Sequence, residues 1–195
     1  MSMLGLKMAT DPRWVNIVEK NIEEILTDHA WCEQKAASNA ITIMVKYPQY
    51  PDLVQEMTKI CQEEIEHFGM VHQKILDRGL TLGRERKDQY VHDLLKFTNR
   101  GGSPEEQFVN RLLFAAMIEA RSCERFKVLS EQINDEDLKI FYRELMISEA
   151  NHYTTFITLA RKYGQGVNVD EKWAAFLEYE AEVISKYGKK ETIHG

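Results

Sequence analysis

Cysteine, proline, glycine and long apolar runs are all scarce in this chain of 195 residues, and each scarcity excludes a class of protein. The three Cys are widely spaced and form no CxxC pair, so we expect reduced thiols in a cytoplasmic protein and no disulfide framework. Four Pro and ten Gly exclude a collagen-like or Gly/Pro-rich disordered chain. No apolar run approaches the roughly 18 residues of a membrane span, and residues 1–10 lack a signal-peptide core.

Positive charge is also in deficit. The 25 Lys and Arg against 31 Asp and Glu leave a net charge of -6. A protein that coats nucleic acid over its whole surface is therefore not expected, and a polyanionic partner would have to meet a local basic patch. With 44% apolar residues, the chain is long enough for one globular domain, 1–195, with a substantial core.

Apolar residues recur with helical periodicity along the whole sequence. No stretch shows the sustained two-residue alternation of a half-buried strand, so the sequence predicts an all-α protein. Local signals mark the helix ends, because Thr and Asp cap helices, proline begins or stops them, and Ser followed by Glu three residues later forms a capping box. These signals are Asp11-Pro12, Thr27 or Asp28, Pro48, Pro51 and Ser103-Pro104 followed by Glu106.

Four long helices are predicted, in two pairs. Each pair shares a short turn, whereas about 25 residues separate the pairs, and one long crossover is the connectivity of ferritin-like bundles. We therefore expect a ferritin-like four-helix bundle with accessory helices and a tail from residue 188. The long helices span about 28–47, 52–78, 104–129 and 135–162 (the core, about 28–162), and the accessory helices about 12–26, 87–99 and 170–187.

Two ExxH motifs on the long helices carry the candidate metal chemistry. Glu64 and His67 form one, and Glu149 and His152 form the other. A spacing of three residues puts both side chains on one helix face, one turn apart, so both can bind one ion. A third match, ending at His194, lies in the predicted tail and is not expected to bind metal.

Each helical ExxH has a partner glutamate upstream. Glu33 precedes Glu64 by 31 residues, and Glu119 precedes Glu149 by 30. One Glu from each of two helices and ExxH from each of the other two is the ligand set of di-iron and di-manganese bundles. Counted from one end of the predicted bundle, all four Glu lie 13–15 residues in. At about 1.5 Å per residue, this is roughly 20–22 Å.

The four glutamates lie on apolar stripes, where burying them ionised and unpaired would be very costly. Two divalent ions would offset their charges if both His are neutral. Carboxylate and imidazole ligands favour iron or manganese over structural zinc, which prefers Cys. Snorkelling or salt bridging is the alternative for any single Glu. Glu63 and His29 are candidates for orienting the ligands. The alternatives are that Glu63 is solvated and that His29 is structural.

The sequence around these positions resembles the tRNA hydroxylase family called MiaE over about residues 12–187. The resemblance rests on the six ligand positions and on the segments DHAWCEQKAAS, around Glu33, and EEIEHF, around His67. Members are ferritin-like non-haem di-iron monooxygenases that hydroxylate the isopentenyl side chain of 2-methylthio-N6-isopentenyladenosine next to the tRNA anticodon. The resemblance thus implies two iron ions held by the six residues, O2 as co-substrate, and an external reductase as electron donor.

A tRNA substrate needs basic contacts on this acidic chain. Arg84, Arg86 and Lys87, in the crossover, are expected to meet phosphates with an affinity that falls as salt rises. A solvated charged loop is the alternative. We expect a monomer or small oligomer without membrane contact. The six-residue pattern alone also admits another di-iron oxidase or peroxidase, a manganese catalase, an iron-storage or ferroxidase protein, and, less favourably, a metal-free bundle.

Overall fold

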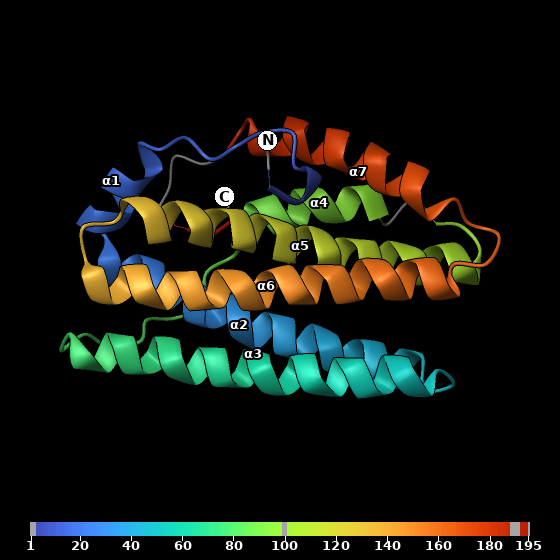
Figure 1. Cartoon of the computed structure of the whole chain (residues 1–195), viewed down its shortest axis with the longest axis horizontal. Coiled ribbons are helices and arrows are strands. Elements are labelled where there is room, and N and C mark those ends of the chain that lie inside the picture. Colours follow the sequence, from blue (N-terminus) through green and yellow to red (C-terminus); the bar gives the residue numbers. More distant parts are fainter. Residues whose placement is uncertain (1–2, 99–100, 188–191, 195) are drawn as a thin grey trace. The chain divides into compact units, whose positions relative to one another are not determined.

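The computed structural model describes residues 3–98, 101–187 and 192–194, and the regular secondary structure among them is helical, with no strand (Figure 1). None of the described helices is long and apolar enough to cross a membrane. The α-helices in this part of the chain are α1 (Trp14–Lys20), α2 (Ile22–Lys46), α3 (Pro51–Asp77), α4 (Gln89–Thr98), α5 (Pro104–Gln132), α6 (Glu136–Tyr163) and α7 (Val169–Ile184), preceded by the short 3-10 turn η1 (Met3–Gly5).

The chain forms two compact units. One contains α2 and α3 and comprises Lys20–Lys87 together with Glu191–Ile193. The other contains η1, most of α1, and α4 to α7, and comprises Met1–Glu19, Asp88–Lys190 and His194–Gly195. The α2–α3 unit and the α5–α6 unit each supply one antiparallel pair of long helices.

The first pair is built around proline and an apolar seam. Helix α2 ends before Pro48, and Pro51 is the first residue of α3. Arg78 caps α3, and Gly79 then takes φ +67°, a conformation that glycine adopts without a steric penalty. The buried residues of α3 recur every three or four positions, as expected for a helix packed on one partner: Leu53, Met57, Ile60, Glu64, His67, Val71 and Ile75.

The prediction of a first helix over 12–26 was wrong about where the chain breaks. The break falls at Asn21, so residues 22–27 belong to α2, which begins six residues earlier than predicted. Thr27 and Asp28, the predicted caps, both lie inside the helix. Their side chains instead accept hydrogen bonds from distant backbone N–H groups, those of Gly83 (3.2 Å) and Ile193 (2.7 Å).

In the second unit, α5 is the central helix. The predicted capping box is present: Ser103 Oγ accepts from Glu106 N–H (3.2 Å), and Glu106 Oε2 accepts from Ser103 N–H (2.9 Å). Besides its partner α6, α5 contacts η1, α4 and α7. Because neighbours cover several of its faces, α5 buries charged residues as well as apolar ones. These include Glu119, Arg121, Glu124 and Arg125.

The accessory helices lie close to their predicted ranges. Helix α4 spans Gln89–Thr98, within the predicted 87–99, but residues 99 and 100 lie outside the described part of the chain. Helix α7 begins after Asn168, whose side chain accepts from Glu171 N–H (3.2 Å). Of the predicted tail, residues 188–191 and 195 also lie outside the described ranges, whereas Ile193 and His194 are buried.

Candidate metal centre

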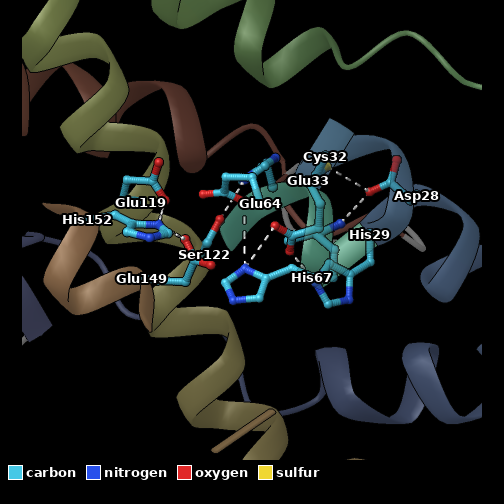
Figure 2. A network of polar contacts seen from close by, with 12 residues as sticks. Asp28, His29, Cys32, Glu33, Glu64, His67, Glu119, Ser122, Glu149 and His152 are labelled. Atoms are coloured by element: carbon cyan, nitrogen blue, oxygen red, sulfur yellow. Dashed lines mark hydrogen bonds and ion pairs between the residues drawn. The ribbon is translucent and has the colours of Figure 1, made fainter. Parts of the chain in front are cut away.

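The first group of predicted ligands comes together between α2 and α3. Glu33, Glu64 and His67 are buried, and each offers a ligand atom within 4.8 Å of those of the other two. His67 Nδ1 lies 3.6 Å from Glu33 Oε2 and 3.7 Å from Glu64 Oε2 (Figure 2). These separations are too long for direct hydrogen bonds. They suit three atoms that share an ion at about 2.0–2.2 Å from each.

His29 holds one oxygen of Glu33. Its ring is fully buried one turn before Glu33 on α2, and His29 Nε2 lies 2.6 Å from Glu33 Oε1. The other oxygen, Oε2, is the one that faces His67. Burial by itself raises the pKa of Glu33, but polar interactions with Glu64, His29 and His67 outweigh it and hold that pKa well below its ordinary value. Glu33 is therefore an ionised carboxylate with a fixed orientation.

The second group repeats this arrangement between α5 and α6. Glu119, Glu149 and His152 are buried, and their ligand atoms also lie within 4.8 Å of one another. His152 Nδ1 lies 3.9 Å from Glu119 Oε2 and 4.0 Å from Glu149 Oε2 (Figure 2). In both groups, then, the His turns Nδ1 toward two carboxylates.

The two helix pairs also share one register. Glu33 lies 13 residues before Lys46, the last residue of α2, and Glu64 lies 13 residues after Pro51, the first residue of α3. Thirteen residues also separate Glu119 from the end of α5 at Gln132, and Glu149 from the start of α6 at Glu136. At about 1.5 Å per residue, each Glu stands roughly 20 Å from the turn of its own pair. This repetition explains why the two sequence spacings are nearly equal.

The donor set of each group fits one divalent ion. Two carboxylates and one neutral imidazole carry a charge of -2, and burying that charge without a counter-ion would cost several kcal/mol. A divalent cation in each group cancels it. The ligands are oxygen and nitrogen atoms, which suit iron or manganese. The residues present therefore fit a metal centre with one ion for each helix pair.

The comparisons with known proteins decide the family. Residues 2–195 match the family described as tRNA-(MS[2]IO[6]A)-hydroxylase (MiaE). The chain belongs to the MiaE family. Membership confirms the resemblance found in the sequence and extends it over almost the whole chain.

Two curated relatives of this family member carry the same name, tRNA 2-(methylsulfanyl)-N(6)-isopentenyladenosine(37) hydroxylase. The protein from Pseudomonas putida is 36% identical over 160 residues, covering 82% of this chain and 77% of its own length. The protein from Salmonella typhimurium is 28% identical over 222 residues, covering 90% of this chain and 81% of its own. This chain is thus an enzyme of the tRNA hydroxylase family.

A solved structure supports the predicted fold class. It is a protein from Synechococcus described as having aldehyde deformylating oxygenase activity, and it is 30% identical to this chain. The TM-score is 0.87, and the match covers 97% of this chain and 95% of the other. The predicted class, all-α and ferritin-like, is confirmed.

The remaining predicted residues lie in different settings. Glu63 is exposed on α3, and its role in orienting a ligand stays a prediction. Arg86 is half-buried and forms an ion pair with Glu24 on α2 (2.8 Å). Arg84 and Lys87 are exposed. Of the three predicted phosphate contacts, only the latter two therefore present their charge to solvent.

Sequence reasoning missed two polar positions around the groups of ligands. Asp28, a predicted cap, is buried on α2 and accepts from Ile193 N–H. Ser122, one turn after Glu119 on α5, is buried beside His194. No sequence signal identified either, because a serine or aspartate within a helical pattern is usually solvated. Cys123 is buried as well, and burial raises the pKa of its thiol to about 12.

Proposed function

We propose that this chain hydroxylates the isopentenyl side chain of 2-methylthio-N6-isopentenyladenosine in tRNA, with O2 as co-substrate and two iron ions as cofactor. The observation that carries the proposal is the pair of buried Glu, Glu, His groups at the same depth of two helix pairs, in a member of the MiaE family. The single-domain prediction for 1–195 is part of the proposal, because ferritin-like bundles direct ligands inward from four helices.

The six residues have defined roles in this proposal. Glu33, Glu64 and His67 hold one iron, and Glu119, Glu149 and His152 hold the other. His29 acts on the first group through Glu33. Its contact with Glu33 Oε1 leaves Oε2 facing His67, where the ion would bind. A histidine that fixes a ligating carboxylate in this way sets its orientation and basicity. The corresponding position on α5, four residues before Glu119, is Ala115, so the two groups differ here.

The reaction needs more than the ligands. Bound iron supplies the redox chemistry that activates O2. The balanced reaction is R–H + O2 + 2 electrons + 2 protons giving R–OH + H2O, with the electrons supplied by an external reductase. The chain's part is to exclude bulk water and to position the ligands. Buried apolar side chains on the ligand-bearing helices do this. They include Ala30 and Ala37 on α2, Ile60 and Val71 on α3, Ala116 on α5, and Leu145 and Phe156 on α6.

The tRNA contacts belong to the start of the crossover. Arg84 and Lys87 are exposed there, whereas Arg86 is engaged by Glu24. Trp31 Nε1 donates to Gly83 O (2.9 Å), and Lys35 pairs with Glu85 (2.9 Å). These contacts tie the segment to α2, so the two exposed cations stand on an anchored loop. We therefore assign the phosphate contacts to Arg84 and Lys87, with Arg86 as a supporting residue.

Metal content and product analysis together test the function. Wild-type protein, purified without added metal and loaded anaerobically with Fe²⁺, should hold about two irons per chain. With a reductant and O2 it should add one oxygen atom to prenylated tRNA, measured by mass spectrometry of the nucleosides. Glu64→Ala combined with Glu149→Ala should lose the iron and the activity. The matched control is Glu66→Ala combined with Glu144→Ala, because these residues are exposed on α3 and α6, the helices that carry Glu64 and Glu149.

The outcomes separate the alternatives. Iron in the control but not in the ligand variant, with hydroxylated tRNA as product, supports the proposal. Two manganese with peroxide turnover would point to a catalase. Iron bound with no effect on tRNA, but with turnover of an aldehyde, would point to the activity named for the Synechococcus protein. No metal after loading would refute the centre.

A further inference from the structure

His194 is a buried histidine at the C-terminal end of the described chain. Its imidazole is only 3% exposed and stacks on Tyr90, with ring centroids 6.1 Å apart and an interplanar angle of 11°. His194 Nε2 lies 3.0 Å from Ser122 Oγ, and His194 Nδ1 lies 3.2 Å from Asp88 Oδ2. The ring therefore joins a hydroxyl to a carboxylate through its two nitrogens. Both polar atoms of this buried ring are thus partnered, as expected for a buried imidazole.

The two ends of this connection lie in different surroundings. Ser122 is buried on α5, three residues after Glu119, so the two side chains share a helix face about one turn apart. Asp88 precedes α4, where its Oδ1 accepts from Val91 N–H (3.1 Å) and its side chain is 10% exposed. Its sequence neighbours Lys87 and Gln89 are exposed. The order Asp88, His194, Ser122 thus leads from near the surface to the turn of α5 that follows a proposed ligand.

The proposed reaction needs protons at a buried site, and a series of hydrogen-bonded side chains can supply them. Two protons are consumed for each O2, and one oxygen atom leaves as water. The ligand groups are buried, so these protons must reach them through protein side chains or ordered water. Imidazole suits the task because one ring nitrogen can accept a proton while the other releases one.

We propose that Asp88, His194 and Ser122 form a proton relay that supplies the hydroxylation reaction from the α5 side of the metal centre. The inference rests on the proposed function. It gives a role to the C-terminal His194, whose ExxH match is not expected to bind metal. The three residues do not touch the substrate, and they act by delivering protons to the ligand side of α5.

The relay step is balanced. The carboxyl group of Asp88, protonated from solvent, gives its proton to His194 Nδ1, while Nε2–H passes a proton to Ser122 Oγ. The hydroxyl proton of Ser122 moves on toward the metal centre. One proton enters at Asp88 and one leaves at Ser122, and the imidazole ends as its other neutral tautomer. No electron moves in this step, because the external reductase provides both.

Two ways of driving the same hydroxylation test the relay. With O2 and a chemical reductant, the reaction consumes two external protons. With hydrogen peroxide it becomes R–H + H2O2 giving R–OH + H2O, which consumes neither external protons nor external electrons. Loss of the relay should therefore slow the O2-driven reaction and spare the peroxide-driven one. A merely structural role would lower both rates together.

The variants are chosen to preserve the packing and to alter only the transfer of protons. His194→Gln can still bond to Ser122 and Asp88 but cannot relay a proton. Ser122→Ala breaks the inner link, and Ser122→Thr restores a hydroxyl. We expect the first two to lower the O2-driven kcat by about 10–100-fold. Their peroxide-driven kcat and iron content should stay near wild type, and Ser122→Thr should recover the O2-driven kcat. The matched control is Ser130→Ala, since Ser130 is also buried on α5 but donates to Lys127 O (2.8 Å).

A measurement without iron adds an independent readout. In metal-free protein with 15N-labelled imidazoles, the ring N–H of His194 should exchange with water through Asp88. Asp88→Asn keeps an oxygen that can cap Val91 N–H but cannot carry the proton. It should therefore slow that exchange by about 10-fold relative to wild type.

The possible results are distinct. A wild-type enzyme that hydroxylates tRNA under neither condition overturns the proposed function and this inference with it. An active wild type in which Ser122→Ala behaves like Ser130→Ala, or in which both driven reactions fall equally, overturns the relay alone. Unchanged exchange at His194 in Asp88→Asn also overturns the relay.

Discussion

Replacing Arg121 with alanine should remove a buried positive charge that hydrogen-bonds to two buried glutamates. Arg121 is fully buried on α5. Its guanidinium donates to Glu180 Oε1 through Nη2 (2.7 Å) and Nε (3.0 Å), and to Glu124 Oε2 through Nη1 (2.9 Å). Tyr90 O–H donates to Glu180 (2.9 Å), and Thr10 N–H donates to Glu124 (2.8 Å). Arg121 therefore joins the segment after η1 to α5 and α7.

The cost follows from what remains after the substitution. Glu180 is fully buried and Glu124 is 6% exposed, so neither carboxylate can recover its charge balance from water. Breaking a buried ion pair by removing one partner typically costs about 3–5 kcal/mol. In a protein of this size, 1 kcal/mol corresponds to roughly 2–4 °C in Tm. We therefore expect Arg121→Ala to lower Tm by about 6–20 °C.

The assay is urea and thermal unfolding of purified variants, with Arg161→Ala as the control. Arg161 also binds a carboxylate, that of Asp170 (2.8 Å), but the two side chains are 57% and 71% exposed. An exposed ion pair contributes about 1 kcal/mol or less, so the control should stay near wild type. A third variant, Arg121→Leu with Glu180→Leu, should be more stable than Arg121→Leu alone, because one unbalanced charge is removed.

Two results would contradict this reasoning. If Arg121→Ala and Arg161→Ala destabilise the protein equally, burial does not set the cost of losing the pair. If the double leucine variant is less stable than the single one, the unbalanced carboxylate is not the source of the instability.

Two further predictions concern the surface. Arg84→Glu combined with Lys87→Glu should weaken tRNA binding, and the slope of log affinity against log salt should fall by about one unit for each phosphate that the variant no longer neutralises. Lys59→Glu, which changes an exposed charge on α3, should leave both unchanged. An unchanged slope in the Arg84 and Lys87 variant would refute the assignment. Gly69 is exposed in α3, and a Cβ there meets nothing within 4 Å, so Gly69→Ala should stabilise the protein by about 0.5–1 kcal/mol. Gly79→Ala should destabilise it by about 1–2 kcal/mol, because Gly79 has φ +67°. Urea unfolding of both glycine variants measures these opposite changes in the free energy of unfolding.

The helices and the proposed ligand positions follow from local sequence. Proline at 48, 51 and 104 ends or begins helices for steric reasons that do not depend on the rest of the fold. Glu64 and His67 were identifiable because they occupy core positions in an otherwise apolar seam. The predicted break at residues 27 and 28 failed because Thr27 and Asp28 serve distant partners, Gly83 and Ile193, which no local pattern reveals.

What the sequence determined by itself is the helical class, the two helix pairs, and the six residues whose types and spacing suit two metal ions. Periodicity and side-chain chemistry carry this information along the chain. Tertiary structure alone decided which charges are buried and paired. It buried Arg121 and Glu124, engaged Arg86 with Glu24, and placed His194 between Ser122 and Asp88. The physical reason is that local sequence predicts a charged helical residue to be solvated, and only tertiary contacts from another part of the chain can bury it.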